Sequence, residues 1–167
     1  MTLENKIARI FNLTEDNWMK HANPWSVWTR YSALPLIIVA FWSRIWIGWW
    51  SLVPIIVSLA WMFFNPVLFP KPKSTNNWAS KSVLGERVWK NRNRVAIPQY
   101  HRTMPNILNV ISFLGMLLSI WAIVALSIWP AILGVALTYI GKSWYLDRMV
   151  WLYEDMKHFP EYEKWLY

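Results

Sequence analysis

Two long hydrophobic blocks constrain the fold of this chain more than any other feature. They cover residues 32–64 and 107–139, and a polar, basic segment lies between them at residues 65–105. One helical membrane crossing takes about 20 apolar residues. Each block is therefore too long for one crossing and about right for two, so each returns the chain to the face where it entered. The pattern predicts an all-α integral membrane protein with four transmembrane helices in two hairpins.

The composition agrees with this class. Hydrophobic residues make up 56% of the 167 residues and charged residues only 16%, and the apolar residues are concentrated in blocks. The length fits a single domain. The chain has 15 Trp and no Cys, which rules out disulfides, thiolate metal sites and cysteine nucleophiles. The first block has no small-residue cleavage pattern behind it, so we expect no removed signal peptide.

The positive charges predict the orientation. Of the 17 Lys and Arg, 16 lie in residues 1–31, 65–105 and 142–167, and only Arg44 lies within a hairpin connection. Basic loops remain on the cytoplasmic side, so we expect a multi-pass protein of the plasma membrane with both termini cytoplasmic. Basic residues beside a membrane attract anionic headgroups. Despite the net charge of +8, we therefore expect anionic membrane lipids rather than nucleic acid as partners.

We predict one membrane domain over residues 1–167, with five parts. These are an amphipathic N-terminal region (1–26), a first hairpin (27–64), a cytoplasmic cap segment (65–105), a second hairpin (106–141), and a C-terminal helix extension and tail (142–167). Residues 2–11 have the spacing of an amphipathic surface helix. Asn65-Pro66 should end the second span, and Trp129-Pro130 should form the tight turn of the second hairpin.

The cap segment has a helical pattern over residues 74–94. Trp78, Ser82, Gly85 and Trp89 fall on one face, so that two rings flank a notch of small residues. This pattern predicts a surface helix in the headgroup region, with a loop anchored by its Trp side chains as the alternative. The last helix should continue out of the bilayer to about Lys157 and pack against this segment.

The predicted spans contain almost no ionisable residues. Transport paths and proton relays are usually marked by such residues at membrane depth, so we do not expect a proton-coupled carrier or an ion channel acting alone. The three His residues do not have a spacing that would place metal ligands together on a helix. We expect no metal ion and no other cofactor.

Polar residues of the predicted cytoplasmic face could act on a lipid headgroup. A His–carboxylate pair can serve as a base, and Arg or Lys can bind a phosphate. The candidate catalytic residues are His21, Glu86, His101 and Asp147, and the candidate lipid- or phosphate-binding residues are Lys81, Arg87, Lys90, Arg102 and Arg148. However, the chain lacks GxSxG, HxxxxD and Walker motifs. The same residues would equally form a salt-bridged cap. In it, Glu86 either pairs with Lys90 one turn further along its helix or is held between Arg87 and a residue of the fourth helix such as Arg148.

Three strings of residues carry a resemblance to a known family. HANPWSVWTR (21–30), NPVLFP (65–70) and NNWASKSVLGERVWKNR (76–92) resemble an uncharacterised family of small, Trp-rich membrane proteins of bacteria and archaea. The resemblance implies four spans and no established function. We favour a non-catalytic accessory or scaffold subunit of a larger membrane assembly or homo-oligomer. The alternative is an enzyme or binding protein for an anionic lipid headgroup.

Overall fold

The computed structural model describes residues 15–167, and every regular element in that range is a helix. The all-α prediction is therefore confirmed, whereas the predicted helix at residues 2–11 lies outside the described residues. The elements are α2 (Glu15–His21), α3 (Pro24–Thr29), η1 (Arg30–Ser32), α4 (Ala33–Trp42), α5 (Arg44–Ile47), η2 (Gly48–Ser51), α6 (Leu52–Leu68), α7 (Trp78–Lys90), η3 (Gln99–His101), α8 (Met104–Ala125), α9 (Ile128–Met156) and α10 (Pro160–Glu163).

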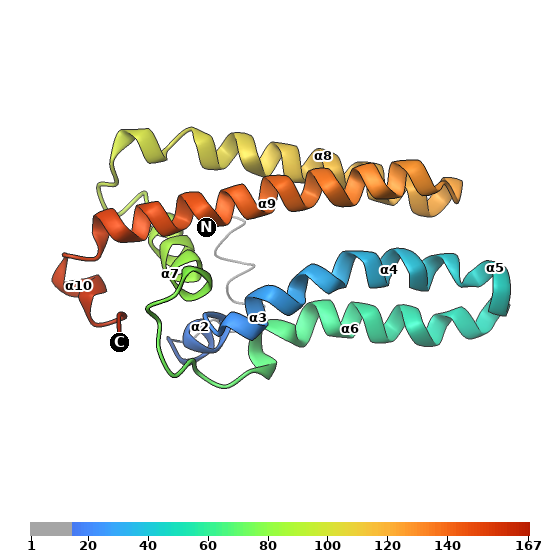
Figure 1. Ribbon diagram of the computed structural model, residues 1–167, viewed down its shortest axis with the longest axis horizontal. Coiled ribbons are helices and arrows are strands. Elements are labelled where there is room, and N and C mark those ends of the chain that lie inside the picture. Colours follow the sequence, from blue (N-terminus) through green and yellow to red (C-terminus); the bar gives the residue numbers. More distant parts are fainter. Residues whose placement is uncertain (1–14) are drawn as a thin grey trace.

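Two helical hairpins lie side by side (Figure 1). In the first hairpin α4 runs outward, α5 and η2 turn the chain, and α6 returns. Gly48 has a positive φ of 54° in this turn, a conformation that favours glycine. In the second hairpin α8 and α9 run antiparallel, and Leu126 adopts a left-handed conformation (φ 53°) between them. The backbone N–H of Leu126 donates to the carbonyl of Ala122, which caps α8.

Two predicted boundaries were wrong. The turn of the second hairpin lies at Leu126 and Ser127, and Pro130 falls inside the first turn of α9, where a missing backbone donor is tolerated. Helix α6 continues through Pro66 to Leu68 instead of ending at Asn65. The side chain of Asn65 is buried and donates to Thr29 Oγ1 at 2.8 Å. This contact fastens the end of α6 to α3.

Small residues allow α8 and α9 to approach closely. A Cβ atom at Gly134 would lie 2.5 Å from Ser119 Oγ, and one at Gly115 would lie 2.5 Å from the backbone nitrogen of Thr138. Both separations are shorter than real Cβ contacts. The two backbones therefore pack directly on each other, as helices in membrane proteins do at small residues.

The cap, which consists of α2, α7, α10 and the second half of α9, contains most of the buried core. Helix α7 begins at Asn77, whose side chain accepts from the backbone N–H of Ser80. Eight of its 13 residues are buried, so the predicted surface helix is a core helix. Its notch receives the backbone of α9, because a Cβ at Gly85 would lie 1.8 Å from the carbonyl oxygen of Met149. The predicted packing of the α9 extension on the central segment is confirmed.

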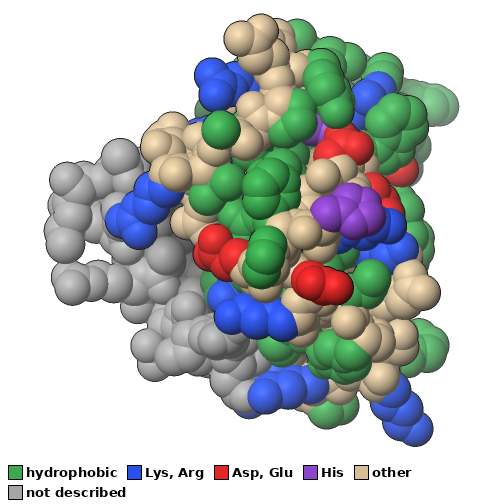
Figure 2. Space-filling view, turned by 90° about the vertical axis from the view of Figure 1, so that its left-hand side faces the viewer, with side chains coloured by type: hydrophobic (Ala, Val, Ile, Leu, Met, Phe, Trp, Pro, Cys, Tyr) green, Lys and Arg blue, Asp and Glu red, His purple; other side chains and the backbone are tan. Residues whose placement is uncertain are grey.

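Two segments are long and apolar enough to cross a membrane, Pro24–Leu68 and Gln99–Ala125. Only 17% and 22% of their most apolar windows are buried inside the protein. The first segment includes both arms of the first hairpin (Figure 1). At the end of the molecule away from the hairpin turns, charged side chains of both signs are interspersed with hydrophobic ones over the cap (Figure 2).

Candidate functional site

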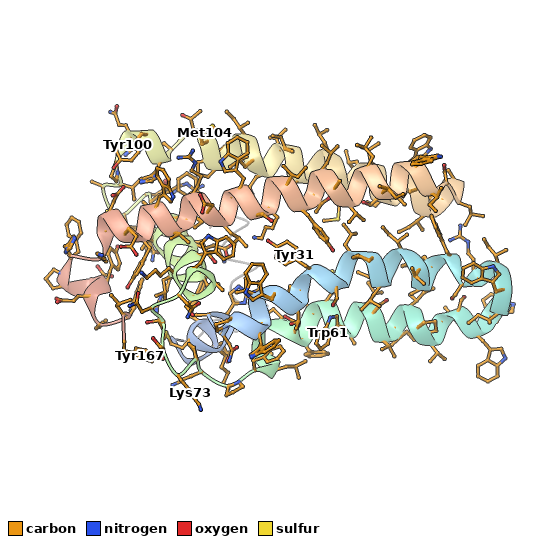
Figure 3. All side chains as sticks on the ribbon, viewed as in Figure 1. Tyr31, Trp61, Lys73, Tyr100, Met104 and Tyr167 are labelled. Carbon is orange, nitrogen blue, oxygen red and sulfur yellow. The ribbon has the colours of Figure 1, made fainter. Side chains whose placement is uncertain are left out.

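A cavity of about 460 Å³ lies between the two hairpins. Its walls are mostly apolar side chains of α4, α6, α8 and α9, and Val83 of α7 contributes from the cap. Tyr31 lies between α9 and the first hairpin (Figure 3). The polar lining residues are Arg30, Tyr31, Ser119, Thr138, Tyr139 and Lys142. The volume lies within the range of about 300–1,000 Å³ that is usual for small-molecule sites.

The hairpins are joined on both sides of this cavity. Toward the hairpin turns, Trp42 Nε1 donates to the carbonyl of Ala122 at 3.2 Å, and Arg44 Nη2 donates to the carbonyl of Ile123 at 2.7 Å. Both acceptors lie in the last turn of α8, where a cation also complements the helix dipole. Toward the cap, Tyr139 Oη donates to the carbonyl of Tyr31. The apolar middle between these contacts is left open.

Arg30 and His21 form a fixed pair at the cap end of the cavity. Arg30 Nη1 lies 3.0 Å from His21 Nε2, and Arg30 Nε donates to the carbonyl of Ser26 at 2.9 Å. A guanidinium only donates, so His21 Nε2 is the acceptor and the ring proton sits on Nδ1. Burial, and then the charge of Arg30, lowers the pKa of His21 to about 3. His21 is therefore neutral at pH 7.

Glu86 of α7 is the acid of a charged cluster that also contains His21, Arg30, Lys90 and Lys142. Burial alone would raise its pKa, but attraction by Lys142, His21, Lys90 and Arg30 outweighs burial and lowers the pKa to about 2. Of the two predicted arrangements of Glu86, Lys90 is among the cations that lower its pKa, whereas Arg87 and Arg148 are not. Of the cations that act on Glu86, Arg30 and Lys142 also line the cavity, whereas Lys90 does not.

A His–carboxylate pair lies between η3 and α9. The buried His101 places Nε2 2.7 Å from Asp155 Oδ2, and Tyr100 donates to the same oxygen at 2.8 Å. The acid predicted to work with the histidines, Asp147, instead accepts from Trp78 Nε1 at 3.1 Å. Neither His101 nor Asp155 lines the cavity. This pair fastens η3 to α9.

The other predicted binding residues are dispersed. Lys81 pairs with Glu154 at 2.7 Å, Arg87 lies over the ring of Trp165 at 4.0 Å, and Arg148 lies over the ring of Trp151 at 4.9 Å. Lys90 lies over the ring of Trp18 at 4.6 Å, and Arg102 is exposed. The structure therefore brings together only His21, Glu86 and Lys90 from the predicted set. Within residues 15–167 no three His, Asp or Glu side chains form a potential metal site.

The sequence reasoning missed Arg30 and Lys142 as site residues. Both line the cavity, and they come from positions 112 residues apart. Each lies beside one of the two hydrophobic blocks, where a lone cation is usually interpreted as an interfacial anchor. That flanking position on both hairpins was the available signal, but it could not show that the two side chains face one cavity.

The fold and the cavity define an all-helical protein in which two apolar hairpins extend from a polar, well-packed cap. The chain belongs to the DUF6653 family, a family of unknown function, which it matches over residues 2–165. The predicted membership of an uncharacterised family is thus confirmed. No curated protein and no solved structure matches the chain.

Proposed function

We propose that this is a four-span protein of the plasma membrane with both termini in the cytoplasm. The low burial of the two apolar segments supports this topology, since a core helix of a soluble protein would be mostly buried. The first half of α9 runs along α8 and would supply the fourth span. The side chains at the first hairpin turn also favour it, with Trp49 87% exposed, because Trp is enriched at membrane interfaces.

Within that topology the protein is a non-catalytic binding protein for an anionic membrane amphiphile. The observation that carries this proposal is the cavity between the hairpins, which has apolar walls and two cations, Arg30 and Lys142, at its cap end. A hydrocarbon chain fits the walls, and an anionic head complements the cations. The His101–Asp155 pair gives the enzyme alternative less support, because it lies outside the cavity.

Blocking the cavity tests the binding function. Ile37 lines the cavity, whereas its neighbour Leu36 is exposed and does not line it. After gentle solubilisation, native mass spectrometry should detect a retained lipid on the unmodified protein and on Leu36→Trp. The lipid should be lost from Ile37→Trp. Equal retention by both variants would place the lipid elsewhere on the protein and reject the proposal.

Cysteine labelling tests the topology in this Cys-free chain. Lys73 is exposed near the cap (Figure 3), and Trp49 is exposed at the first hairpin turn. A membrane-impermeant thiol reagent added to intact cells should label Trp49→Cys and should label Lys73→Cys only after lysis. Labelling of both variants before lysis would exclude the four-span arrangement.

The accessory or scaffold role remains a separate proposal. Many large apolar side chains face outward on both hairpins, and such surfaces can contact lipid or another membrane subunit equally well. Stoichiometric co-purification of a second membrane protein, or a homo-oligomer in native mass spectrometry, would support it. A monomer that carries only lipid would favour the binding function alone.

A further inference from the structure

We infer that the ligand of the cavity is a long-chain fatty acid, whose carboxylate binds at Arg30 and Lys142 while its single chain lies between the hairpins. This inference rests on the proposed lipid-binding function and specifies its ligand. Three features of the cavity lead to it: its hydroxyl groups, its cations and its size.

The hydroxyl groups that line the cavity already have partners within the protein. A head that carries hydroxyls of its own, such as glycerol phosphate or a sugar, needs further donors and acceptors, and an unmet buried polar group is costly. The occupied pairs are Tyr139 Oη with the carbonyl of Tyr31, Tyr31 Oη with Ser143 Oγ (2.9 Å), Thr138 Oγ1 with the carbonyl of Gly134 (2.8 Å), and Ser119 Oγ with the carbonyl of Gly115 (2.9 Å). The hydrogen atoms of the Ser119, Thr138 and Tyr139 hydroxyls are thus already donated within the protein, so the donors for the head of a ligand must come from Arg30 and Lys142.

The two cations retain donors for such a head. Arg30 has five N–H groups and uses three of them, toward Ser26 and toward the ring and carbonyl of His21. The ammonium of Lys142 has three donors and lies over the ring of Tyr145 at 4.9 Å. A carboxylate accepts charge-assisted bonds from both kinds of cation. Among the described residues, two cations and no acid line the cavity, which also favours an anion over a zwitterionic or neutral head.

His21 acts as a positioning residue for this head. Its ring nitrogen and its carbonyl hold two sides of the guanidinium, at 3.0 and 3.4 Å. Because His21 stays neutral, its Nε2 keeps the lone pair that accepts from Arg30. A cation held in place before binding loses less freedom when the ligand arrives, which strengthens binding.

The size of the cavity indicates one chain rather than two. A volume of about 460 Å³ lies in the lower part of the range of about 300–1,000 Å³ for ligand pockets. The lining residues Leu34, Ile37, Met116, Ile120 and Ile123 form a continuous apolar wall along α4 and α8. One extended or folded hydrocarbon chain can contact this apolar wall, whereas a second chain would have to lie outside the cavity.

Binding of defined lipids to the full-length protein, after delipidation in detergent, tests the inference. The probes are a long-chain fatty acid, its methyl ester, the alkyl phosphate of equal chain length and a two-chain phosphatidylglycerol, measured by native mass spectrometry and by Trp fluorescence. The fatty acid should bind most tightly. Lys142→Gln should weaken its binding about tenfold or more, as expected for the loss of one charge-assisted bond. The exposed control Lys164→Gln should leave it unchanged, and neither variant should alter methyl ester binding.

The alternative outcomes separate this inference from the broader function. If the alkyl phosphate or the phosphatidylglycerol binds more tightly than the fatty acid, and Ile37→Trp blocks that binding, the lipid-binding function stands and the fatty acid is the wrong ligand. If Lys142→Gln weakens the methyl ester as much as the acid, the carboxylate site is wrong. If Ile37→Trp changes the binding of none of the probes, both proposals fail.

Discussion

The cap buries its large side chains, whereas the hairpins expose theirs. Among the described residues, a cluster of 19 buried hydrophobic residues is centred on α2, α7, α9 and α10, while only Ile38, Ala122 and Ala131 form a buried cluster between the hairpins. The cap therefore has the core of a small soluble domain. Within the second hairpin, α8 and α9 are held by close backbone contacts. A few hydrogen bonds around the cavity join the two hairpins to each other. Substitutions should act through packing in the cap and through individual contacts in the hairpins.

The largest expected effect is at the crossing of α7 and α9 in the cap. Gly85→Ala would place a methyl group 1.8 Å from the carbonyl oxygen of Met149, so one helix must move. Although Ala is the better helix former, we expect a loss of more than about 3 kcal/mol, beyond ordinary overpacking. Thermal unfolding in detergent measures it. Ser82→Ala, buried on the same helix, is the control, and equal stability of the two variants would contradict this crossing.

The next largest effect should follow loss of the anion in the charged cluster. Glu86→Gln leaves Arg30, Lys90 and Lys142 without their shared counter-charge. Removing one partner of a buried pair costs about 3–5 kcal/mol, and the partial exposure of Glu86 places our expectation at about 3 kcal/mol or less. The exposed acids Glu161 and Glu163 are matched controls. If all three Gln variants unfold at the same temperature, Glu86 does not hold the cap together.

Acid should destabilise the cap through His21 before it acts through the carboxylates. The pKa of His21 is lowered from 6.5 to about 3 in the folded protein, so the unfolded chain binds the proton first. The contribution of His21 to the free energy of unfolding is therefore fully present above pH 6.5. Below that pH it decreases by up to about 1.4 kcal/mol for each pH unit. The corresponding loss for Glu86, whose pKa falls from 4.5 to about 2, begins only below pH 4.5.

Thermal unfolding measured between pH 6.5 and 4.5 isolates the contribution of His21 to the pH dependence of stability. His21→Gln keeps a neutral acceptor for Arg30 and should flatten the stability curve in this window. The exposed His158 provides the control, because His158→Gln should preserve the slope. A slope that survives in His21→Gln would show that another group binds the proton.

The fold could be predicted from the sequence because it depends on local patterns. The two hairpins and the long α9 follow from apolar periodicity and breaker residues. The site depends on how segments far apart in the chain pack together, which places Arg30 and Lys142 along one cavity, and no spacing rule encodes that packing. Of the candidate catalytic residues, His101 contacts Asp155, which was not predicted, and Asp147 accepts from Trp78.

In the hairpins, the largest effect should come from the contact of α8 with α9. Gly134→Ala places a methyl group 2.5 Å from Ser119 Oγ, a side-chain atom, and 2.8 Å from two backbone atoms. The side chain can move, so we expect a loss of about 1–2 kcal/mol, less than at Gly85. Unfolding in detergent compares the two. The exposed neighbour Ala136 serves as the control through Ala136→Val, and a Gly134 effect as large as that of Gly85→Ala would overturn the contrast between cap and hairpins.

The smallest expected effect concerns Arg44, the one Lys or Arg of the described chain that lies at the hairpin turns. Its guanidinium donates to the carbonyls of Phe41 and Ile123, at 3.0 and 2.7 Å, and so joins the first hairpin to the end of α8. Arg44→Gln removes the charge that complements the helix dipole and shortens the reach, which should cost about 1 kcal/mol. Because the cap holds most of the core, global unfolding should change little, whereas hydrogen exchange at the end of α8 should become faster. Arg44→Lys keeps the charge but loses the two-sided contact and should give an intermediate rate. Exchange that is unchanged in both variants would mean that the two hairpins are held together at their turns by apolar contacts alone.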